Sequence, residues 1–558
     1  MNNQQASNCS RSSLIRFLPW SWCFLLIIIL FAGFIRYRLL DMPLERDEGE
    51  YAYAGQLILQ GIPPYELAYN MKLPGTYYVC ALGMAVFGQT IAGMHSTLIV
   101  VNSLTIFFVF VLARKLFGDT AALVAAASYA LMSVSPIVMG LATHANQFVV
   151  LFAVPATWLL WKGREENERA LIFMSGLLYG FAFLMKQQGV FFAVFGSFYL
   201  TLDGVCKRNV PGTIKTVVIY GVGVLLPFFC LCLLLVWQGV FSRFWFWTFT
   251  YAHSYVTTLN WREGLDNLMM HFKRGFWPSA GLWLLGGMGT LLGLYHKTLR
   301  AQTLFIMELW LFAFLGTATG LYFRSHYFIL VLPAFSVLVG AGVGALQNHL
   351  PSRVPVFLMK AIPLGLFALG LGFCAFYQRE LLFRMNDNEV AEVIYQRSPF
   401  IQSTAAAAYI RQHSSVDARI AVLGSEPEIY FYSQRHSATG YIYIYALNEP
   451  QPTAGPMQLD MINEIESAKP EYLVWVGFST SWMPWPPPDK TLSRWAANYI
   501  HTYYATVGVV DTSSGKITCF WDTNAANYGG PYGDYISIYK RLDSADSVAL
   551  SKAASARK

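Results

Sequence analysis

Long apolar blocks dominate about the first two thirds of the 558-residue chain, from Trp20 to about Cys374. Each block is about 17 to 25 residues long, which is the length at which a helix crosses the hydrocarbon core of a bilayer. One buried core of a soluble protein does not account for so many consecutive blocks. The pattern therefore predicts a polytopic α-helical membrane protein with about eleven spans, at 18–40, 91–113, 120–140, 144–162, 170–185, 188–203, 215–238, 279–296, 303–322, 326–347 and 354–377.

Basic residues gather in alternate connections between these spans, as they do in cytoplasmic loops. With a cytoplasmic N-terminus, all of the basic connections lie in the cytoplasm, and the long connections 41–90 and 239–277 lie on the other side. The apolar stretch 75–87 is too short to span and is expected along the membrane interface. The basic connections contain Arg114 and Lys115, residues 162–169, residues 207–215, residues 296–300 and Arg353.

The polar tail has a different pattern. Short β-branched or aromatic runs alternate with helical stretches at 402–412 and 458–467, which predicts a small extracytoplasmic α/β domain over 378–545. The segment Pro484–Pro488 is expected to be a stiff loop, and 546–558 a disordered tail. The runs expected to be strands are 418–423, 428–432, 441–445 and 472–476.

Composition supports the membrane assignment. Hydrophobic residues make up 55% of the chain and charged residues only 13%, whereas soluble chains carry about 25% charged residues. The formal charge of +7 is explained by the basic loops, so no nucleic-acid partner is expected. Eight scattered cysteines without a CxxC pair exclude a disulfide scaffold and a zinc or thiol redox motif.

Polar groups at the non-cytoplasmic ends of the spans are the candidates for chemistry. Asp47 and Glu48 directly follow the first span, where Asp47 also suits a helix cap. Lys72 is a further candidate, but a lysine that extends its charge to the membrane surface explains it as well. The cluster from Thr143 to Gln147 is also a candidate, and helix capping by Thr143 or Asn146 is its alternative explanation. Lys186 lies between two spans, at membrane depth or at the turn of a hairpin. Arg324 and His326 mark the outer end of two late spans.

This combination suits one reaction. A carboxylate takes the proton of an acceptor hydroxyl, while Lys and Arg hold the phosphate of a leaving group. A lipid-phosphate sugar donor supplies that phosphate and gives the enzyme a reason to lie in the membrane, with no nucleotide required.

Several sequence motifs resemble glycosyltransferase family 39 of the GT-C superfamily, which includes dolichyl-phosphate-mannose protein mannosyltransferases and lipid A aminoarabinose transferases. The most specific lies in the first outer loop, and the likeness covers most of the chain. The motifs are Arg46-Asp47-Glu48-Gly49-Glu50-Tyr51-Ala52-Tyr53, Gly61–Tyr65, Asn70-x-Lys72-Leu73-Pro74-Gly75-x-Tyr77-Tyr78, Gly180–Gln187, Gly320–Phe328, Leu332–Ala334 and Gly424–Tyr430 with Ser433-x-Arg435.

The resemblance implies an inverting transfer from a polyprenyl-phosphate sugar to a glycan, lipid or protein acceptor on the outer face of a cell or inner membrane. It implies Asp47 as catalytic base with Glu48 beside it. It also implies that the donor phosphate is bound by Lys72, Arg324, His326 and Lys186. Candidates for binding the acceptor are Tyr51, Tyr53, His144, Asn146, Gln147, Glu426 and Glu428.

One departure from the family pattern concerns metal binding. Relatives carry an acidic residue in the fourth-span segment, where this chain has Asn146 and Gln147. If Gln147 takes that place, a second carboxylate is missing, which counts against a metal site, and a divalent metal ion stays an open candidate cofactor. The departure also leaves a second interpretation, a non-catalytic relative that binds polyprenyl phosphate or acts as a scaffold. A transporter of lipid-linked sugars is the third. It is disfavoured because the polar clusters lie at span ends and no internal repeat is visible.

Overall fold

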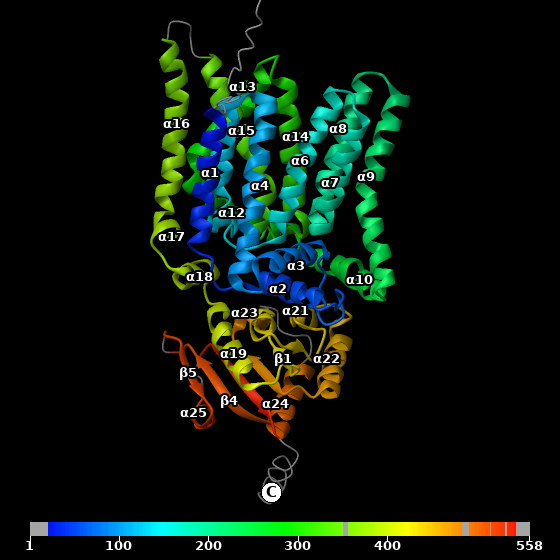
Figure 1. Ribbon diagram of the computed structural model, residues 1–558, viewed down its shortest axis with the longest axis vertical. Helices are drawn as coiled ribbons and strands as arrows, with labels where there is room; N and C mark the ends of the chain where they lie inside the picture. Colours follow the sequence, from blue (N-terminus) through cyan, green and yellow to red (C-terminus); the bar gives the residue numbers. More distant parts are fainter. Residues whose placement is uncertain (1–19, 350–354, 483–489, 514, 531–532, 543–558) are drawn as a thin grey trace, which may run out of the picture.

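The computed structural model describes residues 20–349, 355–482, 490–513, 515–530 and 533–542. A bundle of long helices forms one end of the molecule, and a mixed α/β domain forms the other (Figure 1). Helices α2 (Arg46–Leu59) and α3 (Gly75–Phe87) lie across the junction between them. The predicted fold class, an α-helical membrane domain with a small C-terminal α/β domain, is confirmed.

Every segment expected to cross the membrane contains a helix. The helices that correspond to the expected spans are α1 (Trp20–Tyr37), α4 (Ile91–Phe117), α5 (Asp119–Met132), α6 (Ala145–Glu165), α7 (Arg169–Met185), α8 (Val190–Cys206), α9 (Val210–Trp237), α13 (Ala280–Tyr295), α14 (Arg300–Thr317), α15 (Leu332–His349) and α16 (Val356–Tyr377).

Within the described residues, 6 helices are long and apolar enough to cross a bilayer by length and composition alone. The remaining expected spans are helical but shorter or more polar, so the count of eleven stays a prediction. The six segments are Trp20–Tyr37, Ile91–Phe117, Gln187–Cys206, Val210–Trp237, Ser325–Gln347 and Phe357–Tyr377.

The predicted span 120–140 is wrong at its C-terminal end. Helix α5 stops at Met132, and the chain then forms a buried loop before α6 begins. Arg36 of α1 stabilises this loop by donating hydrogen bonds to the carbonyl oxygens of Ser133 (2.8 Å) and Gly140 (2.5 Å). The residues at 133–140 are apolar enough to mimic a span because they are buried in protein.

The connection 239–277 is helical and irregular. It contains α10 (Phe241–Trp245), a π-helix η3 (Phe246–Tyr251), α11 (Ala252–Val256) and the amphipathic α12 (Trp261–Phe276). Short 3₁₀ turns complete this end of the bundle, namely η1 (Pro136–Val138), η2 (Gln187–Gly189), η4 (Trp277–Ser279), η5 (Thr319–Leu321) and η6 (Ser325–Val331).

The C-terminal domain is built on a six-stranded sheet in the order β2-β1-β3-β6-β4-β5. The first three strands are parallel, and β6, β4 and β5 pair antiparallel. Val422 of β1 pairs with Val474 of β3, which in turn pairs with Ile538 of β6, and all three are buried. The strands are β1 (Arg419–Leu423), β2 (His436–Ser437), β3 (Tyr472–Val476), β4 (Tyr504–Asp511), β5 (Thr518–Trp521) and β6 (Tyr535–Arg541).

Helices connect and cover this sheet. Two of them, α19 and α22, contain the stretches 402–412 and 458–467 that were expected to be helical. The helices are α17 (Arg379–Phe383), α18 (Asp387–Tyr395), α19 (Phe400–His413), α20 (Glu428–Ser433), α21 (Tyr445–Asn448), α22 (Ala454–Ala468), α23 (Ser479–Trp482), α24 (Thr491–Tyr503) and α25 (Thr523–Ala526).

Two of the four predicted strands are confirmed, at β1 and β3. The strand expected at 428–432 is helix α20, and 441–445 is an irregular segment that leads into α21. Both contain closely spaced tyrosines whose side chains pack against α2 and the neighbouring loop, so tertiary contacts override their β propensity. The expected loop 484–488 and tail 546–558 lie outside the described residues.

The α/β domain docks on α2 at very close range. A Cβ added to Gly49 of α2 would lie 2.6 Å from the backbone nitrogen of Glu428, so only glycine permits this approach. The Glu428 carboxylate accepts a hydrogen bond from Ser403 Oγ (2.7 Å), and its other oxygen has no hydrogen-bond partner among the described residues.

Glu428→Gln should weaken the dependence of stability on pH. Burial, and then repulsion by Glu426, raise the pKa of Glu428 from 4.5 to about 8. The folded protein therefore keeps a proton that the unfolded chain releases. The stabilising contribution is complete below about pH 4.5 and is lost as the pH rises through about 8. Thermal melts at about pH 5 and about pH 9 should show a loss in Tm that is roughly 2–5 °C smaller in the variant. The exposed Glu466→Gln serves as control, and equal losses would contradict the assignment.

Candidate active site

A cavity of about 440 Å³ lies where α2, the bundle end and the C-terminal domain meet. Its wall comes from α2, from residues 69–72, from the turn 186–188 between α7 and α8, from 319–327, and from 443–449 of the C-terminal domain. Most of these segments are connections, which is where helical scaffolds usually carry their functional side chains.

Helix α2 presents its acidic residues in two directions. Glu45, not Asp47, is the N-cap: its side chain accepts a hydrogen bond from the backbone N–H of Glu48, and the Glu48 side chain accepts one from the backbone N–H of Glu45. The predicted capping role of Asp47 is therefore wrong. Asp47 and Glu50 are three residues apart and share one face of the helix, whereas Glu48 points elsewhere.

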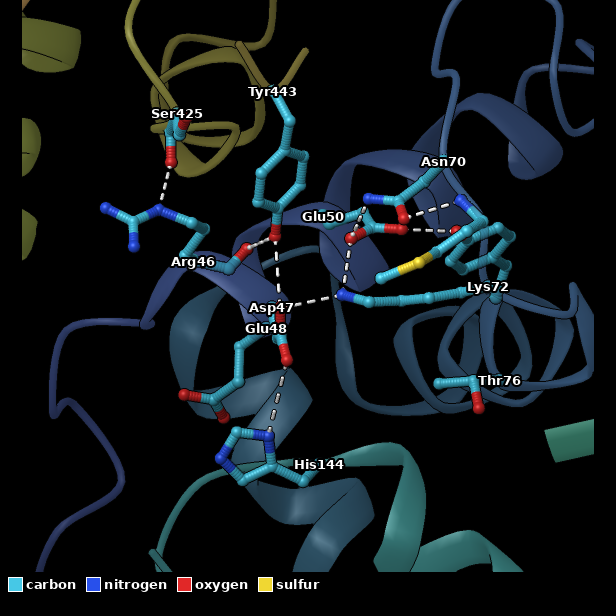
Figure 2. Close-up of polar contacts among 12 residues, drawn as sticks. Arg46, Asp47, Glu48, Glu50, Asn70, Lys72, Thr76, His144, Ser425 and Tyr443 are labelled. Carbon is cyan, nitrogen blue, oxygen red and sulfur yellow. Dashed lines mark hydrogen bonds and ion pairs between the residues drawn. The ribbon is translucent and has the colours of Figure 1, made fainter. Parts of the chain in front are cut away.

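The Asp47 carboxylate faces the cavity beside Lys72 (Figure 2). Lys72 Nζ lies 2.7 Å from Asp47 Oδ1 and 2.6 Å from Glu50 Oε2. The Asp47 side chain is 24% exposed and that of Glu50 only 1%, so Asp47 is the carboxylate that a ligand can reach. The charge of Lys72 is already matched by two carboxyl groups.

The two carboxyl groups differ in pKa. Burial opposes ionisation of Asp47, but Lys72 outweighs it and holds the pKa of Asp47 well below its ordinary value. Burial raises the pKa of Glu50 despite Lys72. Glu50 also accepts hydrogen bonds from Asn70 Nδ2 (2.8 Å) and Tyr77 Oη. Glu50 therefore anchors Lys72, while Asp47 remains ionised at neutral pH.

Glu48 is fully buried on the side of α2 that faces the helix bundle. It accepts a hydrogen bond from the backbone N–H of Thr143 and lies 3.2 Å from His95 Nε2 and 3.5 Å from Tyr395 Oη. These contacts connect α2, α4, α18 and the loop before α6. Glu48 does not line the cavity, and its contacts fix the position of the segment that carries His144.

His144, His326 and Asp47 converge at one point. The two imidazole rings are stacked with centroids 4.1 Å apart, and one ligand atom from each of the three residues lies within 4.8 Å of the others. His144 is the N-cap of α6 without a capping hydrogen bond, so the capping alternative for Thr143 or Asn146 is wrong. Both ring nitrogens of His144 are buried without a hydrogen bond among the described residues, and Nδ1 lies 3.6 Å from Glu45 Oε1 and 4.0 Å from Asp47 Oδ2.

Two histidines and a carboxylate are ligands that suit Zn²⁺ and related divalent cations. The unsatisfied nitrogens of His144 are the observation that favours such an ion, because buried polar atoms are normally paired. The residues therefore fit a divalent cation, although no cofactor is established for the chain.

Lys186 lies in the cavity wall at the turn between α7 and η2. Its Nζ donates to Asn146 Oδ1 (2.9 Å) and lies 4.4 Å from the centroid of the Tyr327 ring. Asn146 Nδ2 donates to Gln188 Oε1, and Gln188 Nε2 donates to the Gly316 carbonyl, both at 3.0 Å, so the amide orientation of Asn146 is fixed. Burial lowers the pKa of Lys186 to about 7. Among the described residues no carboxylate pairs with Lys186, whose side-chain hydrogen bond goes to the amide of Asn146.

Arg324 is the second cation of the cavity without a carboxylate partner within the described ranges. Its Nη2 donates to Tyr255 Oη at 3.1 Å, and the Tyr255 ring stacks on Tyr322 with centroids 4.7 Å apart. These contacts orient the guanidinium and leave its charge uncompensated.

The other predicted site residues lie outside the cavity wall. Tyr51 and Tyr53 are buried, and the Tyr53 hydroxyl accepts a hydrogen bond from the Ser437 backbone. Gln147 Nε2 donates to the Gly140 carbonyl at 3.4 Å. Glu426 forms a 3.0 Å ion pair with Arg46 and, like Glu428, contributes to the contact between the domains. An acceptor role for these residues stays a prediction.

Several cavity residues were not recognised from sequence. Tyr443 of the C-terminal domain donates to the Arg46 carbonyl (2.9 Å) and to Asp47 Oδ1 (3.2 Å), as Figure 2 shows. Tyr445 and Glu449 follow it in the wall, together with Tyr251 and Tyr255 from the bundle side. The sequence contains no signal for these five residues. It does contain one for Glu50, whose spacing of three residues from Asp47 predicts that the two carboxyl groups share a helix face.

The fold is that of a polytopic α-helical membrane protein, and comparison with known proteins shows that the chain is similar to glycosyltransferases of the GT-C type. The profile of the dolichyl-phosphate-mannose-protein mannosyltransferase family matches residues 71–237. The undecaprenyl phosphate-alpha-4-amino-4-deoxy-L-arabinose arabinosyl transferase of Pseudomonas aeruginosa (strain LESB58) is 31% identical over 152 residues, covering 25% of this chain and 27% of the relative. The transferase of the same name from Pseudomonas paraeruginosa is 30% identical over 152 residues, which again cover 25% of this chain and 27% of the relative. The chain therefore matches about a quarter of the length of these curated relatives.

Two solved structures share the fold across most of the chain. ArnT from Cupriavidus metallidurans bound to undecaprenyl phosphate has a TM-score of 0.57 at 14% identity, covering 93% of this chain and 98% of that one. The oligosaccharyltransferase of Archaeoglobus fulgidus in the apo form has a TM-score of 0.51 at 14% identity, covering 92% and 75%. The resemblance to GT-C glycosyltransferases expected from the sequence is confirmed.

Proposed function

We propose that the protein is a membrane glycosyltransferase that transfers a sugar from a polyprenyl-phosphate donor to an acceptor hydroxyl or amine, with inversion at the anomeric carbon. The observation that carries the proposal is the content of one cavity: an ionised carboxylate, Asp47, and two basic side chains, Lys186 and Arg324, that have no carboxylate partner in the described part of the chain. The names of the relatives, an undecaprenyl-phosphate-dependent transferase among them, support the donor class.

In the proposed reaction, Asp47 accepts the proton of the acceptor as the acceptor atom bonds to the anomeric carbon. The bond from that carbon to the phosphate oxygen breaks, and polyprenyl phosphate leaves with its electron pair. The low pKa of Asp47 keeps it ionised, so proton transfer is expected late, once the attacking group has become acidic through bond formation.

Arg324, through its planar fork, and Lys186, in its protonated form, stabilise the negative charge that develops on the leaving phosphate. The pKa of Lys186 is lowered to about 7 without a ligand, and an adjacent phosphate favours its protonated form. Lys72 is less available to the phosphate because two carboxyl groups already neutralise it. We therefore assign Lys72 to holding Asp47, and Glu48 to positioning the His144 segment.

A divalent cation, if bound by Asp47, His144 and His326, would supply a positive charge for the phosphate or the acceptor. The chain's own residues provide the base and two cations without it. Loss of activity on removal of divalent cations would therefore show that a metal ion adds to the contribution of these residues.

We further propose that the cavity lies on the non-cytoplasmic side. Helix α4 runs from the junction with the C-terminal domain to the far end of the bundle (Figure 1), and its last turn contains the basic residues Arg114 and Lys115. The positive-inside rule assigns that end to the cytoplasm. Labelling of the variant Val416→Cys in sealed cells, with the exposed Cys519 of the same domain replaced by serine, tests the assignment, and protection from a membrane-impermeant reagent would reverse it.

The proposed activity is tested by incubating purified protein in nanodiscs with labelled polyprenyl-phosphate sugars and candidate acceptors. Release of polyprenyl phosphate together with a labelled acceptor establishes the transferase. Donor binding without release would favour a non-catalytic binding or scaffold protein. Movement of intact donor between the leaflets of sealed vesicles, without release, would favour a transporter.

A further inference from the structure

A carboxylate in the cavity wall is not used by the proposed reaction. Glu449 directly follows α21 and is only 5% exposed, yet it lines the cavity. Its Oε2 accepts a 2.6 Å hydrogen bond from the hydroxyl of Tyr251. Among the described residues no Lys, Arg or His forms an ion pair with it, and Arg324 acts on it only as a more distant charge.

The partner of Glu449 lies in an unusual backbone segment. Tyr251 ends the π-helix η3, and Trp247 of the same segment also lines the cavity. Turns of π-helix are rare and frequently occur at functional sites, because the additional residue per turn changes the direction of the neighbouring side chains. Glu449 and Tyr251 come from different domains and meet at the cavity.

A buried carboxylate with one hydrogen bond is incompletely satisfied. A carboxylate has about four lone-pair sites, and burial without compensating donors costs free energy. Burial accordingly raises the pKa of Glu449. The carboxylate does not suit an anionic ligand, because a phosphate placed beside it would be repelled. It does suit a neutral or cationic group that donates hydrogen bonds.

We propose that Glu449, oriented by Tyr251, binds a hydroxyl or ammonium substituent of the transferred sugar. Trp247 and Tyr445 supply aromatic surfaces in the same cavity wall, which suit the apolar C–H face of a sugar ring. This inference rests on the proposed function and deepens it: Lys186 and Arg324 recognise the phosphate end of the donor, and Glu449 recognises the sugar end.

The test compares binding of two kinds of lipid to the full chain in nanodiscs. The first kind is bare undecaprenyl phosphate. The second kind is the same lipid phosphate linked to mannose or to 4-amino-4-deoxyarabinose. Wild-type protein should bind at least one sugar-bearing lipid more tightly than the bare lipid. Glu449→Gln should reduce that ratio of affinities by about 10- to 100-fold, the range for a hydrogen bond to a charged group. Binding of the bare lipid should remain within about twofold of wild type.

Two further variants make the result specific. Tyr251→Phe removes the hydroxyl that orients Glu449 and should reduce the same ratio to a smaller extent. Glu466→Gln makes the same chemical change on an exposed face of the same domain and should change nothing. A larger effect on the aminosugar lipid identifies an ammonium partner, and equal effects on both sugars identify a hydroxyl.

The proposal is overturned if Glu449→Gln weakens bare and sugar-bearing lipids equally, or leaves their ratio unchanged. A wild-type protein that gains no affinity from either sugar also overturns it. The binding ratio does not depend on turnover. A chain that binds sugar through Glu449 but never transfers it would therefore refute the proposed function and retain this subsite.

Discussion

Replacing Asp47 by asparagine should reduce transfer by about 10²- to 10⁴-fold, the contribution typical of a positioned general base. Asparagine keeps the size of the side chain and a hydrogen-bond acceptor for Lys72, but it does not accept a proton. The loss should therefore appear in kcat, with binding of undecaprenyl phosphate changed by less than about tenfold. Release of labelled sugar under single-turnover conditions measures the chemical step.

The matched control for this variant is Asp41→Asn, which neutralises an exposed acid shortly before α2. It should retain wild-type turnover. Normal turnover by the Asp47 variant would sink the assignment of the base and shift attention to Glu45, whose carboxylate lies 3.6 Å from His144 Nδ1.

Removing the charge of either Lys186 or Arg324 should weaken the binding of polyprenyl phosphate. Arg324→Ala and Lys186→Gln should each reduce affinity by roughly 10- to 100-fold, because hydrogen bonds to charged groups contribute about 1.5–3 kcal/mol. Arg324→Lys should recover only part of the affinity, since an ammonium lacks the planar fork. Equilibrium binding of undecaprenyl phosphate in nanodiscs measures these effects without depending on the acceptor.

The exposed Arg262→Ala, at the start of the nearby α12, controls for the general loss of a positive charge. Lys72→Gln distinguishes two roles. If Lys72 mainly holds Asp47, its loss should reduce kcat more than affinity. If Lys72→Gln loses affinity for polyprenyl phosphate while Arg324→Ala and Lys186→Gln keep it, Lys72 is the residue that binds the phosphate.

The helical segments could be predicted from sequence because hydrocarbon leaves little choice of structure. Each apolar block must satisfy its own backbone hydrogen bonds, and a helix does so locally. The same logic failed at 133–140, where the apolar residues are buried against protein and Arg36 satisfies two carbonyl groups of the loop. Burial in protein and burial in lipid leave similar traces in composition.

The candidate site was predictable only where its residues are close in sequence. Asp47 lies 25 residues from Lys72, and both belong to one loop whose motif resembles a family. Tyr443 lies 396 residues from Asp47, and no periodicity links them. The role of Glu449 depends on Tyr251, which is 198 residues away. Such pairs arise from domain docking, and the close approach at Gly49 that permits it has no signature in a single sequence.

Because two domains form the cavity wall, the order of their synthesis determines when the cavity is complete. The bundle can insert and pack as soon as α16 has emerged from the ribosome, but the wall formed by Tyr443, Tyr445 and Glu449 is made later and must reach the same side of the membrane as α2. Until the α/β domain has docked, Asp47, Lys186 and Arg324 lack the part of the cavity wall that Tyr443, Tyr445 and Glu449 form. The nascent chain therefore carries the proposed base and both cations before it carries Tyr443, which donates a hydrogen bond to Asp47, and Glu449.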